Sequence, residues 1–252
     1  MPRVTIVGSA DAFNSAGRAH SCYLLEAKGA GQVMVDFGAT ALSRLKQLPR
    51  EPNALDGILI THLHGDHVGG IPFLLIDAMF RARRTRPLHV LGPLGTREAL
   101  DAMFRVTYGP VADYDRSFDF EIEEMAPDQG RDWLGWSIES FPADHMDPPE
   151  APLCLRLQAN GRSVAFSGDT SMCDGLWRAI EGVDLAIVEC TGLQHPIGRH
   201  CAWTDWEAAF PRLSARRLLM THLGDEVRAA AAEGRISAPG VDFAEDGMVI
   251  EL

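Results

Sequence analysis

The stretch Thr61-His62-Leu63-His64-Gly65-Asp66-His67 directly follows an apolar run at residues 57–60 that is typical of a buried strand. Residues two apart on an extended backbone face the same side, so His62 and His64 can point at one site. The turn at Gly65 then lets Asp66 and His67 face a second site nearby. Imidazole and carboxylate groups are the ligands that zinc and its first-row neighbours accept. The stretch therefore predicts a metal centre at the end of a strand.

This H-x-H-x-D-H pattern resembles that of the metallo-β-lactamase superfamily, whose members carry three further ligands in a fixed order. The segments Ser140-Phe141-Pro142-Ala143-Asp144-His145, Ser167-Gly168-Asp169 and Met220-Thr221-His222 are similar to those three, and each follows an apolar run. The resemblance implies one metal bound by His62, His64 and His145, a second metal bound by Asp66, His67 and His222, and Asp169 as a bridge between them.

Taken singly, the later matches have ordinary alternative interpretations. His145 alone would more often be a surface or hydrogen-bonded histidine, and Asp169 alone could cap the helix that follows it. The order of the segments along the chain favours the metal-binding interpretation for both residues.

Within the superfamily the chain is most similar to the ribonuclease Z and phosphodiesterase branch. The similarity rests on Gly92-Pro93-Leu94-Gly95-Thr96, on Glu189-Cys190-Thr191, and on a histidine, His200, that precedes a predicted helix. It implies that His200, oriented by Glu189, protonates the leaving oxygen, while Asp66 orients the nucleophile or accepts its proton. The alternative for His200 is a surface histidine in a loop.

The rest of the chain alternates short apolar runs with helical patterns, which predicts sheets covered by helices. The resemblance implies an α/β four-layer sandwich, in which two mixed β-sheets are flanked by helices and residues 1–252 form a single domain. Thr204 and Glu207 have the spacing of a capping box, which predicts a helix over 204–213. Other helices are predicted over residues 41–47, 71–83, 96–104, 173–180 and 226–233.

The amino-acid composition limits the kinds of macromolecule that this protein can bind. The 252 residues include 23 Lys and Arg against 35 Asp and Glu, so the formal net charge is −12. The segment 108–132 is acidic, whereas ribonuclease Z enzymes carry a basic, Gly-rich arm that binds tRNA. Phosphate contacts depend on Lys and Arg, so we expect neither double-stranded nucleic acid nor a tRNA body as a partner. We expect no membrane association either, because no apolar run reaches about 18 residues.

The five cysteines are widely spaced and form no C-x-x-C pair, which favours a reducing cytoplasm over an oxidising compartment. These observations predict a hydrolase with two divalent ions, zinc being favoured over manganese. The expected substrate is a small anionic phosphodiester attacked by a metal-bridging hydroxide. The alternatives are a lactone, thioester or other acyl substrate on the same metal core, and a non-catalytic protein built on the same fold. A homodimer is left open.

Overall fold

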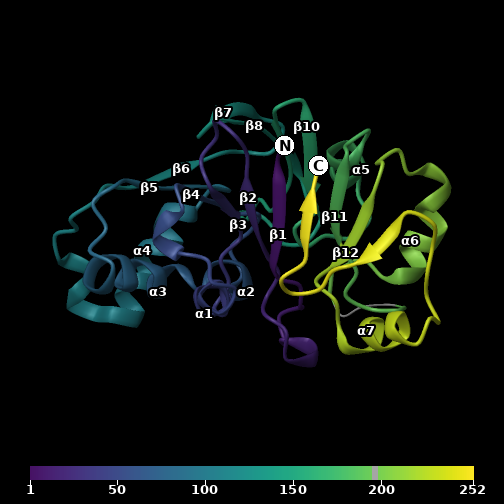
Figure 1. The fold of residues 1–252 in the computed structure, drawn as a ribbon, viewed down its shortest axis with the longest axis horizontal. Helices are drawn as coiled ribbons and strands as arrows, with labels where there is room; N and C mark the ends of the chain where they lie inside the picture. Colours follow the sequence, from purple (N-terminus) through teal and green to yellow (C-terminus); the bar gives the residue numbers. More distant parts are fainter. Residues whose placement is uncertain (195–197) are drawn as a thin grey trace.

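The computed structural model describes residues 1–194 and 198–252, and its centre consists of two seven-stranded sheets. In spatial order, the first sheet contains β14 (Val249–Glu251), β1 (Arg3–Gly8), β2 (Cys22–Glu26), β3 (Val33–Val35), β4 (Gly57–Leu59), β5 (Leu88–Gly92) and β6 (Phe120–Glu124). The second contains β13 (Val241–Phe243), β12 (Leu218–Thr221), β11 (Leu185–Glu189), β10 (Arg162–Phe166), β9 (Leu153–Ala159), β8 (Trp136–Pro142) and β7 (Gly130–Trp133). Figure 1 shows the two chain ends side by side, where β1 pairs with β14.

Both sheets are mixed in the way that the sequence predicts. In the first sheet β3, β4, β5 and β6 are parallel neighbours, whereas β14, β1, β2 and β3 pair antiparallel. In the second sheet β10 to β13 are parallel neighbours, and β7 to β10 alternate in direction. Parallel strands end at the same edge of a sheet, so residues that follow them gather there.

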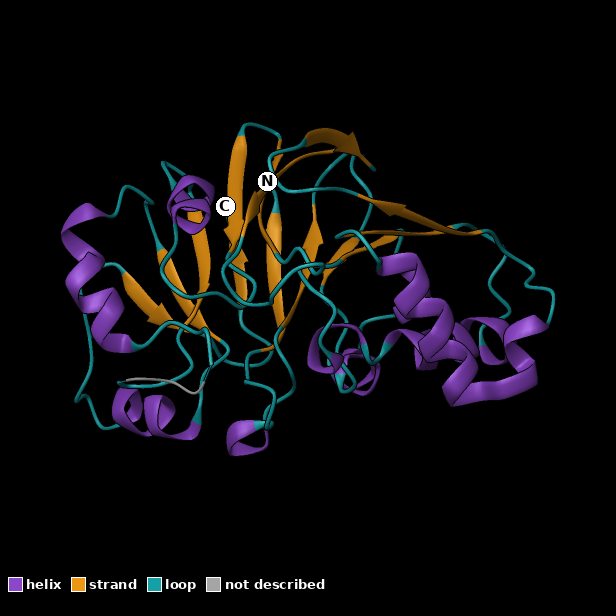
Figure 2. Cartoon of the chain, turned by 180° about the vertical axis from the view of Figure 1, so that it is seen from behind, coloured by secondary structure: helices purple, strands orange, loops and turns teal. Residues whose placement is uncertain are grey.

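Helices cover the outer face of each sheet and complete four layers (Figure 2). The first sheet is covered by α1 (Ala41–Gln47), α2 (Gly65–Val68), α3 (Ile71–Ile76) and α4 (Thr96–Tyr108), with short helical turns at Pro52–Ala54, Asp77–Arg81 and Gly109–Asp113. The second is covered by α5 (Asp174–Ile180), α6 (Trp203–Ala209) and α7 (Asp225–Ala232), with a turn at Phe210–Arg212. A further turn, η1 (Ser15–Gly17), lies between β1 and β2.

Three apolar cores hold the layers together. The central core lies between the sheets and is built from fully buried side chains such as Leu59, Phe166 and Trp136. The two outer cores lie between each sheet and its helices. Helix α4 illustrates the pattern, because its buried residues Thr96, Leu100 and Phe104 recur every four positions and form one face. Among the described residues, no helix combines the length and apolar character that crossing a bilayer requires.

The structure corrects three details of the sequence interpretation. The helix predicted over 71–83 divides into α3 and a wider turn at Asp77–Arg81, and the edge strands β7 and β13 were not predicted. The capping box is wrong: α6 begins at Trp203, so Thr204 lies inside the first turn. The carboxylate of Asp205 instead accepts a hydrogen bond from the backbone N–H of Ala202 at 2.8 Å.

Candidate metal centre and active site

The predicted ligands all follow strands that end at one edge of the molecule, the lower edge in Figure 1. His62 and His64 follow β4, and Asp66 and His67 lie in α2 directly after them. His145, Asp169 and His222 follow β8, β10 and β12, which run in the same direction within the second sheet. The structure therefore brings together residues from both sheets that are up to 160 positions apart, because 222 − 62 = 160.

The first group consists of His62, His64, His145 and Asp169, whose potential ligand atoms all lie within 4.8 Å of one another. The Nε2 atoms of His62 and His145 lie 3.8 and 3.9 Å from Oδ2 of Asp169. Nδ1 of His64 lies 3.0 Å from Nε2 of His145. The structure thus brings three imidazole nitrogens and one carboxylate oxygen together around a single point.

The second group consists of Asp66, His67, Asp169 and His222, again with potential ligand atoms within 4.8 Å. Nε2 of His67 lies 3.2 Å from Oδ2 of Asp66 and 3.4 Å from Oδ1 of Asp169. Nε2 of His222 lies 3.4 Å from each of the same two carboxylates. Asp169 belongs to both groups, which is the position expected of a bridging carboxylate.

Outer partners fix the orientation of His62 and His67. The Thr61 hydroxyl donates to the carboxylate of Asp36 at 2.9 Å, so at its 3.1 Å contact with Nδ1 of His62 it acts as the acceptor. Nδ1 of His67 donates directly to Asp36 at 2.8 Å. In both rings Nδ1 carries a proton, so in the neutral ring the lone pair is on Nε2, which faces the other ligands.

The same arrangement recurs at His145 and His222. Nδ1 of His145 donates to the backbone carbonyl of Arg199 at 3.0 Å. The Thr191 hydroxyl donates to Glu189 at 2.8 Å and accepts from Nδ1 of His222 at 3.0 Å. Four histidines are therefore preset to offer Nε2 to a cation.

These residues fit a pair of divalent ions. The Nε2 atoms of His62 and His67 are fully buried, and within the described residues neither has a hydrogen-bond partner of good geometry. Burying an unpaired polar atom costs free energy, and a coordinated cation removes that cost. The donor set contains only nitrogen and oxygen, which suits zinc and manganese.

Burial and neighbouring charged groups shift the pKa values of several of these ligands. Burial lowers the pKa of His62, and the neighbouring histidines lower it further. Burial also opposes charge on His67 and His222, but the carboxylates beside them outweigh it, so the pKa of His67 is raised and that of His222 is raised to about 9. The pKa of Asp169 is correspondingly held low by His222 and His67, despite its burial.

His200 and Glu189 form a pair beside the bridging carboxylate. Nδ1 of His200 lies 3.0 Å from Oε1 of Glu189 and 4.0 Å from Oδ2 of Asp169. The Glu189 side chain also accepts from the backbone N–H of Thr170 at 2.6 Å and of Cys201 at 3.2 Å. Burial disfavours the charged imidazole, but the bond to Glu189 prevails and raises the pKa of His200. The structure thus places His200 beside the two ligand groups and not on an open surface.

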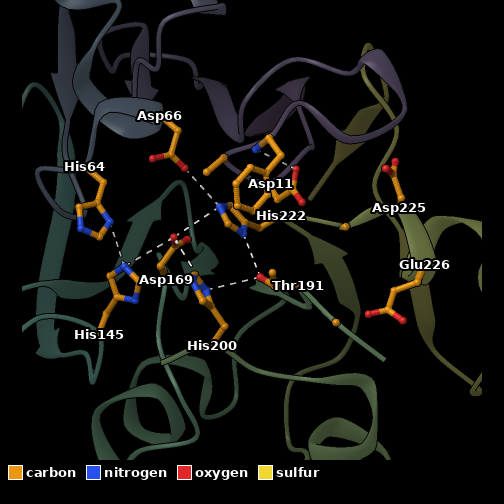
Figure 3. Close-up of a pocket in the computed structure, with 14 residues that line it drawn as sticks. Asp11, His64, Asp66, His145, Asp169, Thr191, His200, His222, Asp225 and Glu226 are labelled. Atoms are coloured by element: carbon orange, nitrogen blue, oxygen red, sulfur yellow. Dashed lines mark hydrogen bonds and ion pairs between the residues drawn. The ribbon is translucent and has the colours of Figure 1, made fainter. Parts of the chain in front are cut away.

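The site opens into a cavity of about 600 Å³. Figure 3 shows His64 and His145 at one end of it and Asp225 and Glu226 at the other, with Asp169, His200 and Thr191 between them. Phe13 also lines the cavity and is 82% exposed. The space is several times larger than a phosphate group, so a substrate can extend well beyond the metal ligands.

Sequence reasoning missed two residues that this arrangement depends on. Asp36 directly follows β3, the parallel neighbour of β4, so its position at the same sheet edge was the available signal. Thr191 was noted only as part of a motif, although its hydroxyl links Glu189 to His222. From the sequence alone, neither residue can be predicted to orient a metal ligand, because this requires knowing which strands are neighbours.

Comparison with known proteins agrees with this geometry. A family model described as the beta-lactamase superfamily domain matches residues 32–223. The chain belongs to this superfamily. A ribonuclease Z of Mycobacterium bovis BCG is 29% identical over 196 residues, covering 74% of this chain and 69% of that protein. The chain is therefore a metallohydrolase, and divalent metal binding is a property of its fold.

Solved structures place the fold in the same group. A diphosphatase of the PhnP family superposes with a TM-score of 0.81 at 17% identity, covering 100% of this chain and 98% of that one. The short form of human tRNase Z superposes with a TM-score of 0.78 at 22% identity, covering 99% and 98%. The predicted four-layer architecture with two mixed sheets is confirmed.

Proposed function

We propose that this protein is a binuclear metal-dependent phosphodiesterase that acts on small anionic substrates. The observation that carries the proposal is the position of Asp169. Its carboxylate is shared by two ligand groups, and the imidazole of His200 lies beside it. A carboxylate shared by two groups supports two ions, and an adjacent acid supports departure of a poor leaving group.

The ligand sets support specific roles. His62, His64 and His145 would hold one ion and Asp66, His67 and His222 the other, with zinc favoured and manganese as the alternative. Divalent ions at such a site act as Lewis acids and make a nucleophile available from water at neutral pH. Asp66 is partly exposed to the cavity, which supports its role in orienting the attacking water or accepting its proton.

His200 supplies the proton that the leaving oxygen needs. Because Nδ1 of His200 donates to Glu189, the proton that can be transferred is on Nε2. The raised pKa of His200 keeps a larger fraction of the imidazole protonated near neutral pH. When the phosphorus–oxygen bond breaks, this proton passes to the alkoxide, which is released as an alcohol.

The remaining expectations belong to the same proposal. We propose that residues 1–252 form one domain, since the central core contains side chains from both sheets. Free thiols at the cysteines, four of them buried, support a cytoplasmic location. The acidic composition supports the exclusion of a tRNA body, although a relative is named ribonuclease Z.

A substrate panel tests the proposal. The purified protein is assayed, with zinc and then with manganese, against bis(p-nitrophenyl) phosphate, dinucleoside monophosphates, lactones and thioesters. We expect turnover of the phosphodiesters that is lost after treatment with a chelator and restored by metal. Faster turnover of a lactone or thioester would favour the acyl alternative, and bound metal without turnover of any substrate would contradict an enzymatic role.

A further inference from the structure

We infer that the outer half of the cavity is a subsite for an uncharged nucleoside, which is the leaving group of the phosphodiester, and that this subsite rejects leaving groups carrying further phosphates. The inference rests on the proposed function and names its substrate class. The subsite is formed by Phe13, Thr191, Gly192, Asp225 and Glu226.

The position of the proton donor identifies which part of the substrate enters this region. Figure 3 shows His200 between Asp169 and Thr191, with Glu226 on the far side of Thr191. A phosphate held at the metal ligands therefore directs its leaving oxygen towards His200. The group attached to that oxygen must extend past Thr191 towards Asp225 and Glu226.

The acidic wall of this subsite, formed by Asp11, Asp225 and Glu226, disfavours leaving groups that carry further negative charge. Three carboxylates line the cavity beyond the metal ligands, those of Asp11, Asp225 and Glu226, and none of the described lining residues is Lys or Arg. Screening in physiological salt acts over about 8 Å, so a second phosphate in this space would experience their repulsion. The exposed carboxylates of Asp225 and Glu226 are at the same time good acceptors for the hydroxyl and amino groups of a nucleoside.

Phe13 offers a surface for the base. Its side chain is 82% exposed, which is unusual for phenylalanine, yet the loop that carries it is well anchored. The buried carboxylate of Asp11 accepts from the backbone N–H groups of Phe13 and Ser15 at 3.2 and 3.1 Å. Asp225 accepts from the backbone N–H of Ala16 at 2.8 Å, which ties this loop to α7. An exposed aromatic ring on a fixed loop is suited to stacking on a base.

The test compares two substrates that differ only in charge on the leaving nucleoside. Hydrolysis of adenylyl-adenosine gives adenosine as the leaving group and adenosine monophosphate as the other product. The same dinucleotide with a terminal phosphate on the departing nucleoside gives adenosine monophosphate from both halves. In each case water adds to phosphorus, the phosphorus–oxygen bond breaks and the leaving oxygen takes a proton. We expect kcat/KM to be at least about tenfold higher for the uncharged leaving group, with the preference shrinking as salt is raised.

Variants assign that preference to the wall. Glu226→Lys should reduce it about fivefold or more. Glu233→Lys, which makes the same charge change at the opposite end of α7, should leave it unchanged. Phe13→Ala should raise KM for adenylyl-adenosine about tenfold with little change in kcat, and Phe13→Trp should retain the wild-type KM. Titration of adenosine into the metal-free protein should show the same ranking of Phe13 variants.

Three outcomes would overturn the inference. Equal kcat/KM for the two dinucleotides, or equal effects of Glu226→Lys and Glu233→Lys, would show that the wall does not select by charge, even where phosphodiester turnover supports the proposed function. Absence of turnover with every phosphodiester, bis(p-nitrophenyl) phosphate included, would overturn the proposed function and this inference together.

Discussion

Four histidines of the site donate a hydrogen bond through Nδ1 to an acceptor outside the ligand groups: His62, His67, His145 and His222. This shared hydrogen-bonding pattern explains why their four rings point Nε2 towards the site. His222 reaches its place through a left-handed backbone, with φ of 53°, which non-glycine residues seldom adopt. Strained conformations of this kind are retained where the surrounding structure holds them in place.

Replacing His200 tests its role as the acid. His200→Ala should leave metal content and fold unchanged, and should slow hydrolysis of a phosphodiester with an alkoxide leaving group by roughly 10²- to 10⁴-fold. Nitrophenolate departs without a proton, so turnover of a nitrophenyl ester should fall far less. Steady-state kinetics with both substrates provide the comparison. Equal losses with both would show that His200 acts in binding and not as an acid.

Replacing Asp169 tests whether its carboxylate bridges the two ions. Asp169→Ala should weaken both ions together, because its carboxylate belongs to both ligand groups. Elemental analysis after dialysis measures the stoichiometry. Thr191→Val is the matched comparison: it removes the acceptor of Nδ1 of His222, which belongs to the second group and not to the first, so we expect roughly 10- to 100-fold weaker binding at the second ion alone. Loss of a single ion from Asp169→Ala would contradict the bridging assignment.

At the scale of elements, close approach of α5 to β8 sets the position of the loop that carries His145. Gly175 packs so tightly that an added Cβ would lie 1.8 Å from the carbonyl oxygen of Pro142. Gly175→Ala must push the helix away, so we expect the free energy of unfolding to fall by about 1–3 kcal/mol in a denaturant titration. Gly130→Ala, where the nearest atom is 3.8 Å away, is the control. A loss no greater than that of the control would contradict this packing.

The secondary-structure elements also show how much of the fold the sequence predicts. The apolar runs predict nearly every central strand, and the pattern over 41–47 predicts α1 with its observed ends, Ala41–Gln47. Strands β7 and β13 are only four and three residues long, and Trp133 is the one buried residue among them, so neither contains an apolar run that would predict it. Asp36 and Thr191 escape notice because their roles depend on strand neighbours, which periodicity does not specify.

At the scale of the whole molecule, metal binding should be linked to pH. The pKa of His222 is raised to about 9, so this ring is protonated in the metal-free protein at pH 7.5, and the pKa of His67 is raised as well. Coordination needs neutral imidazole, so binding should release about one proton from His222 at this pH, and less as the pH rises through 9. Calorimetric titration in two buffers of different ionisation enthalpy measures this release.

The raised pKa of His222 also makes the stability of the metal-free protein depend on pH in a definite direction. Because the folded-state pKa of His222 lies above its unfolded value of about 6.5, its contribution to stability is complete below pH 6.5. That contribution is lost as the pH rises through about 9. A binding enthalpy that is the same in both buffers would mean that no proton is released and would contradict the charge assignment at this centre.

We propose that two ions in one site, joined by Asp169, hydrolyse a phosphodiester. The most direct test titrates zinc into the metal-free protein while following both bound metal and turnover of bis(p-nitrophenyl) phosphate. We predict that turnover rises to a plateau at two equivalents per chain and that Asp169→Ala abolishes the rise. A plateau at one equivalent with full activity, or two bound ions without turnover, would contradict the claim.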